Sequence, residues 1–194
     1  MHFTLCDMIA DLVQNAVEAK ANHIEIQLIQ TDKNFTFFIK DNGIGMRKEE
    51  LCQVTNPFFT NGNKHPLRHV GLGIPFFIQT VEVSNGKYEI SSTYGKGTSL
   101  YAKINLKTID TPPVGDIPGL FRLLVTMPDM LDNLNCCEVL INRIYIESEI
   151  LKRNYQISRK KLLEKIGTFD SVNALVFLEE YCYLQEHSEN KGRS

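Results

Sequence analysis

In "IKDNGIGMRKEE", residues 39–50, a run of alternating apolar residues ends in a carboxylate and two closely spaced glycines. Asp41 falls at the predicted end of a strand, and a carboxylate at a sheet edge can accept a hydrogen bond from an exocyclic amine. Gly43 and Gly45 have no Cβ, so the backbone there can approach a flat ligand closely. Since Asn-Gly is also a strong turn signal, this stretch alone predicts only a turn.

Regular elements are predicted on both sides of this loop from the spacing of apolar residues. In chain order they are a helix over 4–21, strands over 23–29 and 35–40, helices over 47–54 and 73–83, and a strand, a turn and a strand over 83–106. This order predicts an α+β fold, a two-layer α/β sandwich with helices on one face of a mixed, mostly antiparallel sheet.

The chain is predicted to divide into a domain over 1–106, a Pro/Gly connector over 107–120 and a small, mostly helical region over 121–194. The last region is a small α/β extension, with a strand predicted over 137–147 and helices before and after it. It has fewer than 90 residues, which favours packing on the first domain over independent folding.

Composition and charge narrow the possible partners. The net charge is −2 and there is no arginine-rich arm, so nucleic acid binding is not expected. No apolar run reaches the roughly 20 residues of a membrane helix. The 5 cysteines have no Cys-x-x-Cys spacing, and the N-terminus has no secretory pattern, which predicts a reduced, cytoplasmic protein. The adjacent Cys136 and Cys137 are more typical of thiols than of a metal site.

Two further polar clusters stand before and after the glycine loop. One side of the first helix carries Asp7, Asp11, Gln14, Asn15 and Glu18. Such a stripe is ordinarily a solvated helix face. Gly71 and Gly73 precede an apolar helix, where free N–H groups and the helix dipole favour an anion.

The three clusters, in this order, resemble the GHKL (Bergerat-fold) superfamily of ATP-binding domains, which includes gyrase-type topoisomerases, histidine kinases and MutL proteins. "DLVQNAVEAKA" is similar to its N box, "DNGIGM" and "GLGI" to its glycine boxes, and "GKGTSL" to its Gly-x-Thr segment. "NPFFTNGNKHPLRHVGLGI" resembles the lid of a histidine-kinase ATPase domain. The resemblance covers about residues 5–106.

The resemblance implies ATP and Mg²⁺ as ligands and gives each matching residue a role. Asn15 would hold Mg²⁺, Asp41 would bind the adenine amino group, and Thr98 would support Asp41 or its bound water. The base would be lined by Gly43, Gly45 and Met46. The phosphates would be bound by Gly71, Leu72 and Gly73, with Lys64 or Arg68 of the lid closing on the γ-phosphate.

Two departures from the family pattern bear on catalysis. Asp11 occupies the position where other branches of the superfamily place a glutamate that activates water. Aspartate can be a general base, but its shorter side chain withdraws the carboxylate. Glu18 stands where many histidine kinases carry a basic residue, and an acidic residue there would repel phosphate unless Mg²⁺ lies between them.

Three functions are compatible with these residues. The first is a nucleotide-dependent switch or slow ATPase that acts on a protein partner. The alternatives are a protein kinase of the anti-sigma-factor type, with Asp11 as base, and a binding module without catalysis. The N box begins within about ten residues of Met1, so a complete histidine kinase is not expected. "DTPPVGDIP" resembles stand-alone ATPase-domain proteins of anaerobes, which suggests a redox or signalling partner.

Overall fold

A single sheet forms the centre of the computed structural model, which describes residues 4–55, 73–132 and 137–188. Its strands lie in the order β3-β4-β2-β1-β5-β6. The strands are β1 (His23–Gln30), β2 (Asn34–Asp41), β3 (Lys87–Thr93), β4 (Gly97–Asn105), β5 (Glu138–Glu147) and β6 (Ile150–Ser158). The helices are α1 (Leu5–Glu18), α2 (Lys48–Thr55), α3 (Gly73–Val83), α4 (Ile117–Asp132), α5 (Arg159–Ile166) and α6 (Val172–His187).

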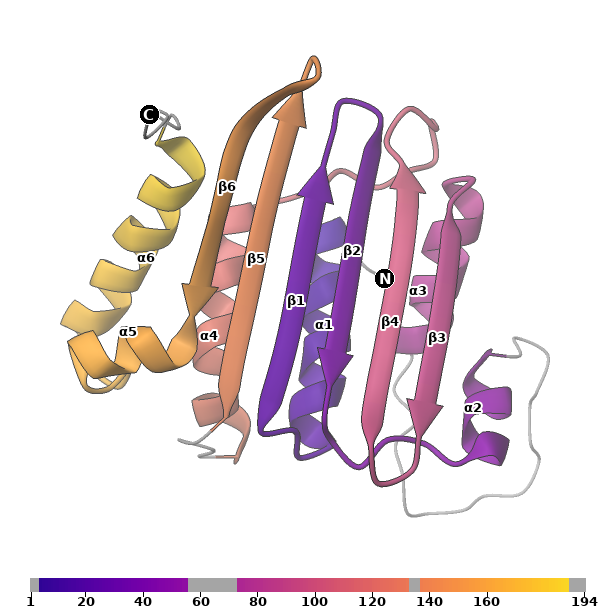
Figure 1. Cartoon of the computed structure of the whole chain (residues 1–194), viewed down its shortest axis with the longest axis horizontal. Helices are drawn as coiled ribbons and strands as arrows, with labels where there is room; N and C mark the ends of the chain where they lie inside the picture. The colour runs from indigo at the N-terminus through magenta and orange to yellow at the C-terminus, as the bar shows by residue number, and fades with distance from the viewer. Residues whose placement is uncertain (1–3, 56–72, 133–136, 189–194) are drawn as a thin grey trace.

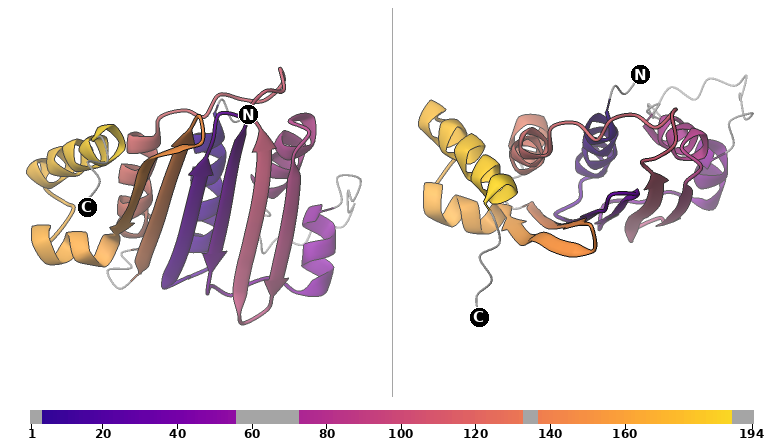
Figure 2. Two further views of the ribbon diagram at one scale, coloured as in Figure 1. Left: turned by 45° about the horizontal axis from the view of Figure 1, so that its top comes forward. Right: turned by 90° about the horizontal axis from the view of Figure 1, so that it is seen from above.

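The helices α4, α1 and α3 lie side by side on one face of the sheet (Figures 1 and 2). α2 lies near β3 at one end of the sheet, and α5 and α6 lie at the β6 end. β1 pairs with β5 in parallel, and the other neighbouring strands pair antiparallel. The predicted two-layer sandwich with a mixed, mostly antiparallel sheet is therefore confirmed.

The helix α1 is specified by its cap and its apolar stripe. Thr4 and Asp7 form a capping box at its N-terminus, which satisfies backbone N–H groups that the helix leaves unpaired. Its inner face is fully buried, and this stripe includes Met8, Leu12 and Val13. Burial of these side chains against the sheet supplies most of the stability of a helix of this length.

Alternating burial fixes the register of the central strands. Ile26 of β1 lies opposite Ile39 of β2, and both are buried on the helix-covered face. A slip by one residue would move this apolar set to the open face, so the pattern specifies the pairing strongly. Phe77 of α3 packs edge-to-face on Phe37 and Tyr88 at 5.8 and 5.7 Å between ring centroids, which fastens α3 to the sheet.

The C-terminal residues extend the same sheet. Residues 138–147 form the predicted strand, but the sequence analysis missed β6, which pairs with it as a hairpin. Most β6 side chains are exposed or half-buried, so the strand lacks the apolar alternation that would reveal it. α4 also begins at Ile117, inside the predicted connector, because Asp116 accepts the Gly119 N–H and caps it.

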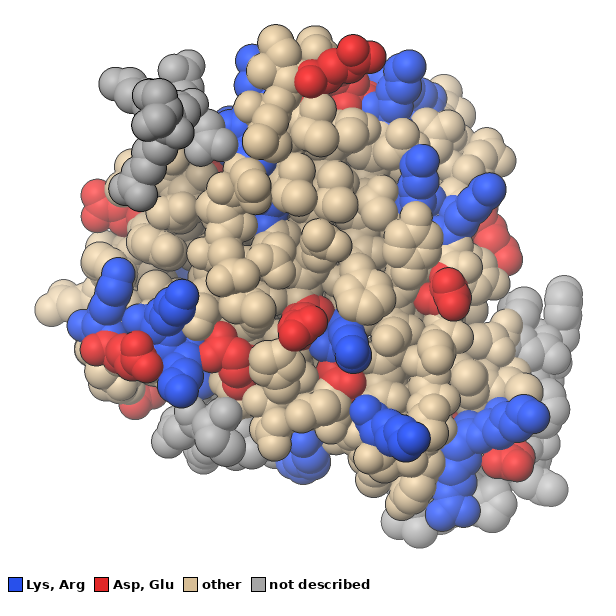
Figure 3. Space-filling view, viewed as in Figure 1, with Lys and Arg blue, Asp and Glu red and all other residues tan. Residues whose placement is uncertain are grey.

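The sheet face away from the helices is open, and Figure 3 shows it from the front. Lysine, arginine, aspartate and glutamate side chains of both signs are interspersed around it, without a continuous basic track. Of the helices in the described ranges, none has both the length and the apolar character needed to span a membrane.

Candidate functional site

One line of residues along α1 brings the predicted polar clusters together. Asp11, Asn15 and Ala19 follow one another at four-residue spacing, which places them on one side of the helix, about 6 Å apart along its axis. Gly73 begins α3 against this line: a Cβ built on Gly73 would lie 3.1 Å from the Asn15 amide nitrogen and 3.8 Å from the Asp11 Cβ. Two predicted clusters thus meet where α3 begins.

The glycine loop after β2 is fixed to the next turn of the same line. The Ile44 N–H donates to the Ala19 carbonyl at 2.8 Å, and a Cβ on Gly43 would lie 2.7 Å from that oxygen. Gly45 has φ +63°, and its Cβ would lie 2.2 Å from the Thr93 carbonyl oxygen. The structure therefore shows why neither position accepts a side chain: a Cβ atom there would collide with protein backbone. The sequence had predicted that this space serves a ligand.

Asp41 is a nearly buried carboxylate at the start of this loop, with 8% of its surface exposed. Its Oδ1 accepts the Gly43 N–H at 2.8 Å. Burial raises the pKa of Asp41, and the backbone N–H groups of Gly43 and Thr98 partly offset this by stabilising the charged form. The group is thus held by main-chain donors and is placed at the strand end that the sequence predicted.

Other residues on the polar side of α1 have hydrogen-bond partners within the helix and its cap. Asp7 belongs to the capping box, and the Gln14 amide donates to Glu18 at 2.8 Å. Glu18 is exposed, so solvent screens its charge. Asp11 and Asn15 are the members of the stripe that Gly73 approaches.

Two residues of this region were missed by sequence analysis. Asn42 accepts the N–H groups of Asn22 and His23, both at 3.0 Å, and so fixes the loop to the start of β1. Ser92 on β3 contacts both the loop and Thr98, as the Met46 N–H donates to its Oγ at 2.8 Å. A serine in an exposed strand carries no signal of such a role, and only the sheet register reveals it.

Four predicted ligand residues, Lys64, Arg68, Gly71 and Leu72, lie outside the described residues. Their roles remain predictions. Met46 is half-buried and Thr98 lies on β4 next to the loop, so the predicted residues that the structure describes gather around α1 and the loop.

The described residues include no cluster of three or more histidine, cysteine, aspartate or glutamate side chains that could hold a metal by themselves. Mg²⁺ commonly takes one or two protein ligands together with substrate phosphates and water. The half-buried Asn15, beside the Cβ-free start of α3, fits this mode of binding.

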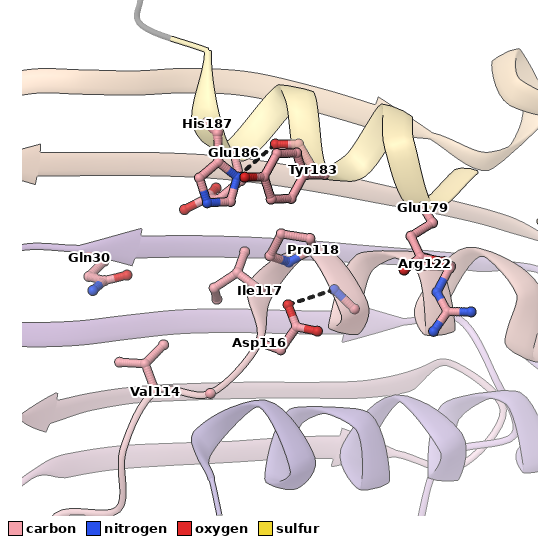
Figure 4. Close-up of a pocket in the computed structure, with 12 residues that line it drawn as sticks. Gln30, Val114, Asp116, Ile117, Pro118, Arg122, Glu179, Tyr183, Glu186 and His187 are labelled. Atoms are coloured by element: carbon pink, nitrogen blue, oxygen red, sulfur yellow. Dashed lines mark hydrogen bonds between the residues drawn. The ribbon is translucent and has the colours of Figure 1, made fainter. Parts of the chain in front are cut away.

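A separate cavity of about 440 Å³ lies between the start of α4 and the end of α6 (Figure 4). Tyr183 and His187 stack along it at 4.0 Å between ring centroids. Its lining includes Asp116, which caps α4, and Glu186, which accepts from Arg143 and Tyr155. None of the predicted ligand residues in the described ranges lines it, so we place the candidate site at α1 and the glycine loop.

The order of elements and the residues brought together at α1 agree with an ATP-binding domain of the GHKL class. Residues 3–108 match the family model "Histidine kinase-, DNA gyrase B-, and HSP90-like ATPase", which is more than half of the chain. The chain belongs to this family.

Curated relatives of this chain include sensor proteins and a sporulation kinase. The chain is 29% identical over 100 residues to sporulation kinase C of Bacillus subtilis, covering 50% of this chain and 22% of that kinase. It is 34% identical over 103 residues to the sensor protein KdpD of Clostridium acetobutylicum, covering 51% of this chain and 11% of KdpD. The chain therefore spans about a fifth or less of the length of these two relatives.

Among solved structures, the Aquifex aeolicus MutL ATPase domain complexed with ADP is similar at 12% identity and a TM-score of 0.39. The match covers 93% of this chain and 70% of the MutL domain. The N-terminal domain of a DNA repair protein matches at 16% identity and a TM-score of 0.45, covering 86% of this chain and 57% of that one.

Proposed function

We propose that this protein binds Mg-ATP at the site formed by α1, the glycine loop and the start of α3, and acts as a nucleotide-dependent switch or slow ATPase toward a protein partner. Family membership supports binding of ATP. The observation that carries the assignment of residues is the approach of Gly73 to Asn15 and Asp11 on the same side of α1 that holds the glycine loop.

In this proposal the nucleotide lies along α1 from the Ala19 end to the Asp11 end. Asp41 accepts a hydrogen bond from the adenine amine, and the start of α3 receives the phosphates, where N–H groups and the helix dipole favour an anion. The base is bordered by Gly43, Gly45, Met46 and Thr98, and the lid cations Lys64 and Arg68 belong to the γ-phosphate end. Mg²⁺, when bound with ATP at Asn15, neutralises phosphate charge.

The metal part of the proposal is tested with Asn15→Ala. We expect this change to abolish the strengthening of ATP binding by Mg²⁺ and to leave the affinity without Mg²⁺ nearly unchanged, because the amide would contact only the ion. Isothermal titration calorimetry with ATP and ADP, with and without Mg²⁺, measures both quantities.

Gln14→Ala is the matched control for this experiment, since it removes a neighbouring amide that is paired with Glu18. It should keep the full response to Mg²⁺. An equal Mg²⁺ response in wild type and Asn15→Ala would reject Asn15 as the metal ligand and leave the α1 stripe as a solvated helix face.

Asp11 is the proposed general base. Asp11→Asn should reduce turnover by about 10²-fold to 10⁴-fold with little change in ATP affinity, because general-base catalysis contributes this much and binding rests on other residues. Phosphate release under saturating ATP measures the loss. If wild type binds ATP, releases no phosphate and labels no partner, Asp11 has no catalytic role and the protein is a binding module.

A second candidate function is phosphorylation of a partner protein, and the similarity to sporulation kinase C favours it. Transfer of radiolabel from ATP to a partner distinguishes this activity from hydrolysis. We propose that the partner is a signalling or redox protein and that the two proteins interact in the cytoplasm. Neither nucleic acid nor a membrane is part of this proposal.

A further inference from the structure

Ser92 connects the glycine loop to β4 through three close contacts of its hydroxyl. The oxygen lies 2.8 Å from the Met46 nitrogen, 3.1 Å from the Gly97 carbonyl oxygen and 2.9 Å from the Thr98 hydroxyl oxygen. Ser92 stands directly opposite Thr98 in the β3–β4 pairing, so the two side chains share one face of the sheet.

These contacts determine where each proton goes. The Met46 N–H can only donate and the Gly97 carbonyl can only accept, while a serine hydroxyl has one proton and two lone pairs. If all three contacts are hydrogen bonds, the Ser92 proton goes to Gly97, and the Thr98 hydroxyl must donate its own proton to Ser92. The hydrogen-bonding capacity of Ser92 is then fully used.

Thr98 therefore offers only lone pairs to any other partner. The adjacent Asp41 carboxylate also only accepts when ionised, and the Thr98 N–H helps to stabilise that charge. Asp41 and Thr98 thus give the proposed base site two hydrogen-bond acceptors and no side-chain donor, an arrangement that suits an amine with two hydrogens. It disfavours a carbonyl at the same place, because acceptors would face each other without a proton between them.

We infer that Ser92 is a positioning residue: it fixes the direction of the Thr98 hydroxyl so that the base site selects a 6-aminopurine over a 6-oxopurine. This inference rests on the proposed function, since it takes the base to lie at Asp41. Without the Ser92 hydroxyl, Thr98 can rotate and donate to a 6-oxo group, so discrimination falls even when the loop keeps its shape.

The test compares the dissociation constants of ATP and inosine triphosphate by calorimetry. Inosine triphosphate carries a carbonyl where ATP carries the amine. We expect wild type to prefer ATP by about tenfold or more, and Ser92→Ala to lower this ratio about 3-fold to 10-fold, the equivalent of one neutral hydrogen bond. Ser92→Thr retains a hydroxyl and should keep the wild-type ratio.

Thr98→Val separates this role from a general loosening of the loop. It should lower the ratio by itself, and adding Ser92→Ala to it should change the ratio no further, because Ser92 acts through the Thr98 hydroxyl. A loop effect alone would weaken both nucleotides equally and leave the ratio unchanged.

The possible outcomes separate a failure of the Ser92 inference from a failure of the proposed function. ATP binding with an unchanged ratio in Ser92→Ala overturns the inference and leaves the proposed function intact. If Ser92→Ala does not fold, an unchanged ratio in Thr98→Val overturns it equally. A folded wild type that binds neither nucleotide rejects the proposed function and the inference together.

Discussion

Asp41 and Glu186 are equally buried carboxylates, each 8% exposed, in very different surroundings. Glu186 accepts from the Arg143 guanidinium at 2.9 Å and 3.3 Å and from the Tyr155 hydroxyl. The hydrogen bonds that the structure gives to Asp41 come from main-chain N–H groups. Glu186 is thus bound by charged and polar side chains, whereas the donors that the structure gives to Asp41 are backbone groups.

Under the proposed function, this difference separates a charge that holds the fold together from a charge that binds a ligand. Arg143 is 1% exposed and also donates to Gln30 on β1 at 2.7 Å, so the Glu186 network joins α6, β5 and β1. A buried ion pair of this kind fastens elements together. The pKa of Asp41 is raised by burial, which means that its charged form is under-stabilised, and a hydrogen-bond donor from a ligand can supply the missing interaction.

The largest effect is expected from breaking the structural pair. Arg143→Met should reduce the free energy of unfolding by about 3–5 kcal/mol, because it leaves the Glu186 charge buried without its cation. Urea unfolding followed by circular dichroism measures the change.

Lys152→Met is the control on the same hairpin. Its ion pair with Glu147 is 3.8 Å long and both side chains are largely exposed, so a change of less than about 1 kcal/mol is expected. An Arg143→Met protein as stable as the control would show that the Glu186 network contributes little to the fold.

A smaller effect, on binding instead of stability, is expected at the other carboxylate. Asp41→Asn keeps the shape but turns one acceptor into a donor that faces the adenine amine, which should cost about 1–3 kcal/mol of ATP binding. Calorimetric titration of a variant shown to be folded provides the measurement. Unchanged ATP affinity would remove Asp41 from the site, and the contrast with Glu186 would lose its functional meaning.

The smallest effect is a pH dependence of stability without nucleotide. A raised pKa in the folded state means that Asp41 stabilises the fold while protonated, and that this contribution is lost as pH rises through its folded pKa. Asp41→Asn should therefore gain stability relative to wild type as pH increases from below 4 towards neutrality. Thermal unfolding at several pH values tests this, and a relative stability that falls over this range would contradict the raised pKa.

The sequence predicted the first half of the chain well because its signals are local. The alternation in β1 and β2, the stripe of α1 and the glycines around Asp41 each lie within a short stretch, and the structure has the elements there. The two halves of the Arg143–Glu186 pair are 43 residues apart, and neither position is unusual by itself. Ser92 was missed for the same reason, since its partners come from another strand and from a loop.

For two glycines of the loop, the sequence predicted correctly that a side chain is not tolerated but did not predict the physical reason. Gly43 and Gly45 were expected to make room for a ligand, and the structure shows backbone oxygens of Ala19 and Thr93 in the way of their Cβ atoms. Sequence patterns indicate where a side chain is not tolerated, but they do not say which neighbour excludes it.

The parallel pairing of β1 with β5 has a consequence for how this chain can be divided. All of His23–Gln30 pairs with Glu138–Tyr145, so a fragment that stops after residue 108 would present β1 as a bare edge of unpaired amides and carbonyls. Edges of this kind act as templates for association with other chains. During synthesis, β1 and β5 can pair only after β5 has been made, which is long after β1 leaves the ribosome. We therefore expect a fragment that ends after residue 108 to associate more readily than the whole chain.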